Sequence, residues 1–177
     1  MAIGLPEPAH TELTTWRQRL GDPNAWAIPP HITLLPPTSF PDDALPEIEE
    51  HLRSVAAGEE PFDIHLRGSS SFRPVSPVVF VPLAEGISGC ERVEGKVRSG
   101  PLERELGFPY HPHVTVAHDV GDELLDQAFA ELSSYQARFR AWGFTMFEQG
   151  SDHVWRPQRD FPFGRVGLPG PAVARDA

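Results

Sequence analysis

Two copies of one short motif constrain the fold of this chain more than any other feature. Residues 30–34 read Pro-His-Ile-Thr-Leu, and residues 112–116 read Pro-His-Val-Thr-Val. Each copy is short, apolar and rich in β-branched residues, which predicts a strand. Side chains alternate along a strand, so the histidine and threonine of each copy share one face while the apolar residue between them points into a core. We expect the two strands to lie side by side and face one cleft.

The remaining pattern predicts helices and strands that alternate along the chain. Apolar residues at helical spacing indicate four amphipathic helices, and short apolar or alternating runs indicate strands. Because each half of the chain contributes one motif strand, this order predicts an α+β fold with two similar lobes. The expected helices cover residues 10–20, 42–57, 87–97 and 122–132, and the expected strands cover 1–5, 30–35, 62–66, 78–83, 111–118, 137–147 and 153–161.

Local signals refine these boundaries. Asp42 and Asp43 suit the N-terminus of the second helix, and Asp122 is expected to cap the fourth. Residues 68–71 are expected to form a loop, and Gly143 to bend a single long strand over 137–147. The expected buried sides of the second and fourth helices consist of Leu45, Ile48, Leu52 and Val55, and of Leu124, Leu125, Ala128, Phe129 and Leu132.

Length and composition indicate one domain. A chain of 177 residues suits a single domain, which we place at residues 1–166, with a disordered tail over 167–177 that has little to pack. The sequence has no apolar run long enough for a transmembrane helix and no secretory leader, so no membrane association is expected. The single cysteine, Cys90, excludes an internal disulfide and favours a cytoplasmic location. We expect a monomer.

The charge of the chain restricts its ligands. The formal net charge is −10, and Lys96 is the only lysine. Proteins that bind long nucleic acids generally present a basic stripe to the phosphates, and this sequence contains no run of Lys and Arg. Long RNA or DNA is therefore not an expected partner, whereas a small anion in a local pocket is compatible with this composition.

The paired motifs suit acid–base chemistry on a phosphodiester. Histidine titrates near neutral pH, so one imidazole can take a proton from an attacking water or hydroxyl while the other gives a proton to the leaving oxygen. Charge that develops on the phosphate oxygens needs hydrogen-bond donors, which Thr33 and Thr115 can supply. We therefore predict His31, His113, Thr33 and Thr115 as catalytic residues, with no metal and no cofactor.

With these motifs, the sequence resembles the two-histidine (2H) phosphoesterase superfamily, in the branch of 2′-5′ RNA ligases and RNA 2′,3′-cyclic phosphodiesterases. The resemblance covers most of residues 1–164. It implies a bilobal α+β fold in which two pseudo-symmetric lobes with antiparallel sheets form a central cleft. It also implies catalysis by His31 and His113, with Thr33 and Thr115 on the phosphate. In relatives that open cyclic phosphates the second histidine is usually the base, which assigns that role to His113 and the role of acid to His31.

The resemblance further implies a substrate class and three binding residues. Relatives open a 2′,3′-cyclic phosphate, and some join RNA ends through a 2′-5′ bond, so the expected partner is a small nucleotide cyclic phosphate or an RNA terminus. Phe72 and Arg73 stand where relatives have groups near the cleft, and are candidates for base stacking and phosphate contact. Many relatives have an arginine just after the second motif; this chain has His118, a further candidate contact.

Two other functions fit the same residues. His111 and His113 lie two residues apart on one face of a strand, a spacing that can hold zinc, and together with His31 they would make a metal-dependent hydrolase. The motif companions include no Asp or Glu, which weighs against this hypothesis. The protein could instead bind a nucleotide or a cyclic phosphate with little turnover, because binding and catalysis would use the same residues.

Overall fold

The computed structural model describes residues 1–164, so the predicted tail over 167–177 and the domain boundary at 166 lie outside the described residues. The expected alternation of helices and strands is present. The strands are β1 (Ala2–Gly4), β2 (His31–Thr33), β3 (Phe62–Arg67), β4 (Ser70–Ser71), β5 (Val78–Glu85), β6 (His113–His118), β7 (Gln136–Ala141), β8 (Gly143–Gln149) and β9 (Trp155–Pro162). The α-helices are α1 (Ala9–Arg19), α2 (Leu45–Ala57), α3 (Ile87–Val97) and α4 (Asp122–Glu131), with 3-10 turns η1 (Asp42–Ala44) and η2 (Gly100–Leu102).

The strands form one antiparallel path whose halves mirror each other. The spatial order is β7-β3-β5-β6-β2-β1-β8-β9, with β4 paired to β5. The two motif strands, β2 and β6, are neighbours at the middle of this path, and four strands of the path belong to each half. The expected pair of lobes with antiparallel sheets is therefore confirmed, and the motifs meet where the two lobes join.

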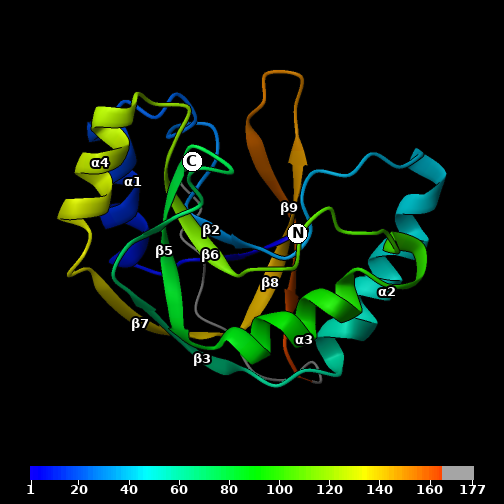
Figure 1. The fold of residues 1–177 in the computed structure, drawn as a ribbon. Coiled ribbons are helices and arrows are strands. Elements are labelled where there is room, and N and C mark those ends of the chain that lie inside the picture. Colours follow the sequence, from blue (N-terminus) through cyan, green and yellow to red (C-terminus); the bar gives the residue numbers. More distant parts are fainter. Residues whose placement is uncertain (165–177) are drawn as a thin grey trace.

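A pair of helices flanks each half of the sheet. Helices α1 and α4 lie together on one side of the molecule, and α2 and α3 lie together on the other (Figure 1). Helix α4 packs against β5 and β6, and α2 packs against α3 and β9. The β8–β9 hairpin rises between the two helix pairs. The apolar residues at the centres of the motifs, Ile32 and Val114, are completely buried in this core, as their alternation predicts.

Two expectations about strands were wrong. Residues 137–147 do not form one bent strand: β7 pairs with β3, whereas β8 pairs with β1 and β9 in the other half. Gly143 is the first residue of β8, and the position requires glycine because a Cβ atom there would lie 2.4 Å from the Phe161 carbonyl oxygen. Residues 70–71, expected in a loop, form β4 against β5. Alternation along a chain predicts a strand but does not specify which other strand it pairs with.

The helix boundaries also differ in detail. Asp122 is the first residue of α4 and does not cap it; Gly121 holds the cap position without a side-chain bond. Asp42 and Asp43 form η1, and α2 begins at Leu45 with a proline in its first turn, where the missing N–H costs nothing. Three residues expected on buried sides are exposed because they lie at the margins or first turn of their stripes: Leu45 (36% exposed), Leu124 (36%) and Phe129 (45%).

Candidate active site

The pairing of β2 with β6 brings the two motifs together. Ile32 lies opposite Val114 in this antiparallel pair. The same register sets His31 opposite Thr115 and Thr33 opposite His113, because residues on either side of a paired position are also paired. Side chains opposite one another on paired strands share a face of the sheet. The two histidines and two threonines therefore form a diagonal arrangement on one face.

The His31 ring is held at both nitrogens. Its Nδ1 lies 2.7 Å from the Pro29 carbonyl oxygen and its Nε2 lies 3.0 Å from Thr33 Oγ1. A carbonyl oxygen only accepts, so Nδ1 carries the proton, and Nε2 of the neutral ring accepts from the Thr33 hydroxyl. The Trp155 ring covers the imidazole at a centroid distance of 4.6 Å. These contacts leave Nε2 as the nitrogen that can take up a proton at the cleft.

His113 is oriented in the same way by its own motif. Its Nδ1 donates to the His111 carbonyl oxygen at 2.7 Å, so its Nε2 is the nitrogen left for a substrate. Phe72 and Phe80 contact this ring, each at a centroid distance of 5.0 Å. In both motifs, therefore, the carbonyl two residues before the histidine fixes the tautomer.

Both imidazoles hold their protons less readily than a free histidine. Removal from water lowers the pKa of His31 from 6.5 to about 4, with smaller lowering contributions from the charges of Arg17, the N-terminal amine and His113. The pKa of His113 is also lowered, mainly by burial. The bonds to the Pro29 and His111 carbonyls act in the opposite direction. At neutral pH both rings are neutral in the empty site.

A pocket of about 170 Å³ opens beside the first motif. Among the predicted site residues, His31, Thr33, Thr115 and His118 line it, whereas His113, Phe72 and Arg73 are outside its lining. His113 adjoins this pocket through its pairing across from Thr33. The structure thus brings four predicted residues to one pocket and sets His113 at its side.

Phe72 and Arg73 lie on the His113 side of the site, engaged with other residues. Phe72 packs against Phe80 at 4.2 Å and meets the His113 ring edge-on. The Arg73 guanidinium pairs with Asp126 at 2.7 Å. Their predicted roles in base stacking and phosphate contact stay predictions.

Among the pocket residues that sequence reasoning missed are Arg17 and Trp155. Trp155 comes from the far end of the chain, and its backbone N–H donates to the Ala27 carbonyl at 2.8 Å. No local sequence pattern predicts that these two segments lie together. Arg17 did leave a signal, because it falls between Leu13 and Leu20 on the buried side of the predicted first helix. A charge on a core-facing stripe is costly unless it is paired.

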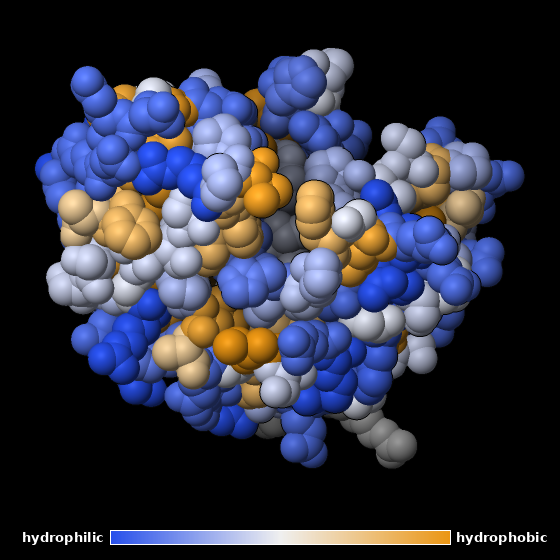
Figure 2. All heavy atoms as spheres, viewed as in Figure 1, coloured by the Kyte–Doolittle hydropathy of each residue, from blue (hydrophilic) through white to orange (hydrophobic). Residues whose placement is uncertain are grey.

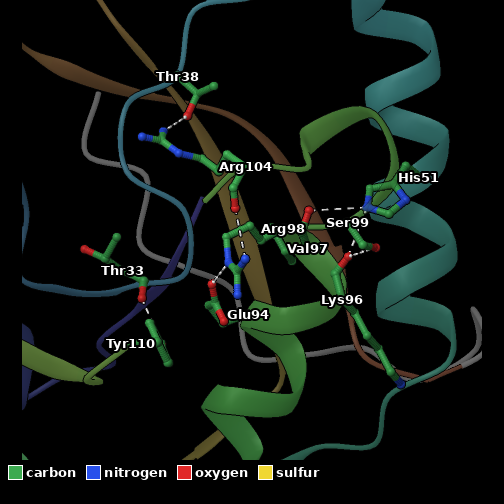
Figure 3. Close-up of polar contacts among 10 residues, drawn as sticks. All are labelled: Thr33, Thr38, His51, Glu94, Lys96, Val97, Arg98, Ser99, Arg104 and Tyr110. Carbon is green, nitrogen blue, oxygen red and sulfur yellow. Dashed lines mark hydrogen bonds and ion pairs between the residues drawn. The ribbon is translucent and has the colours of Figure 1, made fainter. Parts of the chain in front are cut away.

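A hydrogen bond ties the segment before the second motif to the first motif. The Tyr110 hydroxyl donates to the Thr33 carbonyl oxygen at 2.9 Å (Figure 3). The same segment is held further out, where Arg104 donates to Thr38 and Arg98 donates to the Arg104 carbonyl. The loops around the two motif strands are thereby joined directly, outside the sheet.

The surface of the molecule is mixed in character. Figure 2 shows a largely hydrophilic face with apolar side chains gathered at the edges of a hollow. The strongly exposed apolar residues include Trp26, Val75 and Phe108, which lie in the loops before β2, between β4 and β5, and before β6. Trp26 is closest in sequence to the pocket, which Asn24 and Ile28 help to line.

The described residues contain neither a cluster of metal-ligating side chains nor a helix that could span a membrane. Within residues 1–164, no group of three His, Cys, Asp or Glu side chains is arranged to hold a metal ion. In the same range, no helix combines the length and apolar character needed to cross a membrane.

Residues 5–153 match the 2′-5′ RNA ligase superfamily. The chain belongs to this superfamily, whose members are 2H phosphoesterases. The resemblance first seen in the two motifs is confirmed, and the match includes both of them.

Curated relatives of this superfamily member carry the name "putative phosphoesterase". One from Bacillus licheniformis is 34% identical over 109 residues, which span 62% of this chain and 63% of that protein, slightly less than two thirds of its length. One from Halalkalibacterium halodurans is 30% identical over 127 residues, 71% of this chain and 73% of the relative. One from Oceanobacillus iheyensis is 29% identical over 151 residues, 81% of this chain and 85% of the relative.

Solved structures share the fold of this superfamily member. Escherichia coli LigT in complex with 3′-AMP superposes with a TM-score of 0.64 at 17% identity, covering 93% of this chain and 96% of LigT. The Thermus thermophilus protein TT0787 gives a TM-score of 0.60 at 22% identity, covering 94% and 97%. LigT has also been solved with NADP+. At these identities the likeness establishes the fold.

Proposed function

We propose that the protein is a metal-independent phosphodiesterase that opens a 2′,3′-cyclic phosphate on a small nucleotide or at an RNA end, with His31 and His113 as its acid–base pair. The observation that carries the proposal is the diagonal pairing of two His-x-Thr motifs across β2 and β6. It sets two imidazoles and two hydroxyls on one face, as attack on a phosphorus atom with a departing oxygen requires.

The reaction needs one proton removed and one delivered. The base takes a proton from water, the water oxygen forms a bond to phosphorus, and the bond from phosphorus to the 2′- or 3′-oxygen breaks. The acid then gives its proton to that oxygen, so the product is a phosphomonoester beside a free hydroxyl. When substrate binds, the Thr33 hydroxyl turns from His31 Nε2 to the phosphate, which frees Nε2 for the water. Thr33 and Thr115 then donate hydrogen bonds to the phosphate oxygens as their negative charge increases.

The unequal surroundings of the two histidines support His31 as the base and His113 as the acid. Trp155 covers the His31 ring, and the pKa of His31 is lowered to about 4. Of the two rings, His31 therefore has the stronger preference for the neutral form. A base must start neutral, and an acid must be protonated when the leaving oxygen departs. The negative charge of the bound phosphate raises the pKa of a neighbouring imidazole, and the less strongly shifted His113 is the ring that then takes up a proton. The proposed roles are the reverse of those that the resemblance implies.

The size of the pocket supports a small substrate or the end of a chain. Pockets that enclose whole drug-sized ligands have volumes of about 300–1,000 Å³, whereas this one has about 170 Å³. It suits a phosphate and part of a ribose, with the remainder of the ligand outside. The exposed Trp26 offers an apolar surface for a nucleobase there. LigT, which shares the fold, was solved with the nucleotides 3′-AMP and NADP+.

Hydrolysis of the four nucleoside 2′,3′-cyclic monophosphates in EDTA tests this proposal. Wild type is compared with His31→Ala, His113→Ala and the surface control His10→Ala, and the products are resolved as 2′- or 3′-phosphates. We expect turnover in EDTA for wild type and His10→Ala, and losses of at least about 10²-fold in the other two variants. Activity that disappears with EDTA and returns with zinc would instead favour the metal-dependent hydrolase. Tight binding of these nucleotides without turnover would favour a binding protein.

A further inference from the structure

We propose that Arg17 binds the phosphate of the substrate in the His31 pocket through its Nη2 amino group, supplying the permanent positive charge of the site. The inference rests on the proposed function, because it assigns a partner to the anion on which that function acts. Arg17 lies in the last turn of α1, outside both motifs.

The pocket needs a cation because its other donors are neutral. A phosphodiester carries a negative charge, and the protein as a whole repels anions with its net charge of −10. Both imidazoles are neutral in the empty site, and the threonines contribute only hydroxyls. Arg17 is the only Arg or Lys among the residues that line the pocket, where its companions include His31, Thr33 and Thr115. A guanidinium stays charged at every physiological pH and suits phosphate geometry.

The guanidinium is fixed in place with one nitrogen unused. Its Nε donates to Asp22 Oδ2 at 2.8 Å, and its Nη1 donates to the Ile28 carbonyl oxygen. Nη2 makes no hydrogen bond to another residue within 1–164. The residue is 4% exposed, and it borders the pocket. Two bonds therefore orient the group, and the third nitrogen is left for a ligand.

Asp22 does not cancel this charge at the pocket. Its Oδ1 is occupied by the backbone N–H of Asn24 at 2.8 Å, so the carboxylate is shared between Arg17 and the turn that follows α1. The positive charge of Arg17 is one of the smaller causes that lower the pKa of His31. Asp22 also lines the pocket, but each of its carboxylate oxygens already accepts a hydrogen bond, one from Arg17 and one from Asn24. The unused donor beside the pocket is therefore that of the cation.

An NMR titration with inorganic phosphate at low ionic strength tests the inference without any turnover. Binding is monitored through the 15N signals of the arginine side chains. In wild type we expect saturable binding that shifts the Arg17 guanidinium signals. Arg17→Gln should weaken binding at least tenfold, and Arg17→Lys, which keeps the charge but loses the fork, about threefold. Arg19→Gln, an exposed change of equal charge in the same helical turn, should stay within twofold.

Asp22→Asn separates anion binding from a purely structural role. This variant removes the ion-pair partner but keeps the cation, so phosphate should bind as tightly as in wild type or more tightly. If Arg17 serves only to hold the turn, Asp22→Asn would weaken binding as much as Arg17→Gln, and the inference would be wrong. Wild type that binds no phosphate, or whose Arg17 signals do not move on binding, would overturn it even if Arg17→Gln did not fold.

Failure of the role of Arg17 and failure of the proposed phosphodiesterase activity give different results. Phosphate binding that depends on Arg17, together with an absence of cyclic phosphodiesterase turnover, would leave Arg17 as the anion site of a protein with another activity. Turnover that depends on His31 and His113 but is unchanged in Arg17→Gln would retain the proposed function and reject the role of Arg17.

Discussion

Ile32 and Val114 lie opposite each other on neighbouring antiparallel strands, and both are completely buried. This pair lies where β2 and β6 join the two lobes. A shift of one residue would turn every side chain of the strand to the other face. The same pair that fills the core thus also fixes which histidine lies across from which threonine.

Shortening one member of this pair should therefore destabilise the protein. Val114→Ala removes buried methyl groups and leaves a cavity, so we expect the free energy of unfolding in urea to fall by about 2 kcal/mol. Val75→Ala deletes the same atoms from a residue that is 75% exposed, and should change it by less than about 0.5 kcal/mol. Equal losses in the two variants would contradict the placement of Val114 at the core of the lobe junction.

The proposed division of roles between the histidines can be tested with a leaving group that needs no proton. On a nitrophenyl phosphodiester, His113→Ala should lose less than about tenfold in rate, while on a cyclic phosphate it should lose at least about 10²-fold. His31→Ala should lose heavily on both, because water still has to be deprotonated. The opposite pattern would restore His113 as the base.

The pH dependence of stability should report the burial of His31. Its pKa is about 4 in the folded protein and about 6.5 in the unfolded chain. Between these values the unfolded state binds more protons, so stability falls as pH falls from about 6.5 to about 4. For this half-buried residue we expect a contribution of about 1–3 kcal/mol.

His31→Gln should remove this contribution, which is measured as the difference in urea unfolding free energy between wild type and variant at pH 7 and pH 4.5. His10→Gln, which deletes a histidine at the start of α1, is the matched control. A difference that does not change with pH would show that the His31 ring is not desolvated in the folded state.

The sequence predicted what is local and missed what is brought from a distance. The face shared by His31 and Thr33 follows from alternation, and the helical stripes from their spacing. The separation of β7 from β8 depends on their partners, β3 for one and β1 and β9 for the other, which no local pattern specifies. Trp155 reaches the site for the same reason. Arg17 was not predicted as a site residue, and only its contact with Asp22 and its place beside the pocket show why a buried charge is tolerated in the first helix.

Phe72 offers a test between two roles. The sequence predicts base stacking, whereas its edge contact with the His113 ring at 5.0 Å favours a positioning role. We expect Phe72→Leu to lower kcat about tenfold on cyclic nucleotides and to change KM less than twofold, because the His113 ring that it supports is displaced. On a nitrophenyl phosphodiester, whose leaving group does not need the proton of His113, the change in kcat should be smaller. A rise in KM confined to substrates with a nucleobase would instead support stacking.

The hydroxyl of Tyr110 should stabilise the junction of the two motifs. It donates to the Thr33 carbonyl oxygen at 2.9 Å, and Tyr110→Phe leaves that oxygen without this donor while the ring keeps its packing. We expect a loss of about 1 kcal/mol in the free energy of unfolding, the usual net contribution of such a bond.

The exposed contact of Arg104 with Thr38 serves as the comparison, and Thr38→Ala should cost less than about 0.5 kcal/mol. Because Thr33 also donates to His31 Nε2, Tyr110→Phe should lower kcat as well. A variant as stable and as active as wild type would show that the register of β2 and β6 holds Thr33 in place without this bond.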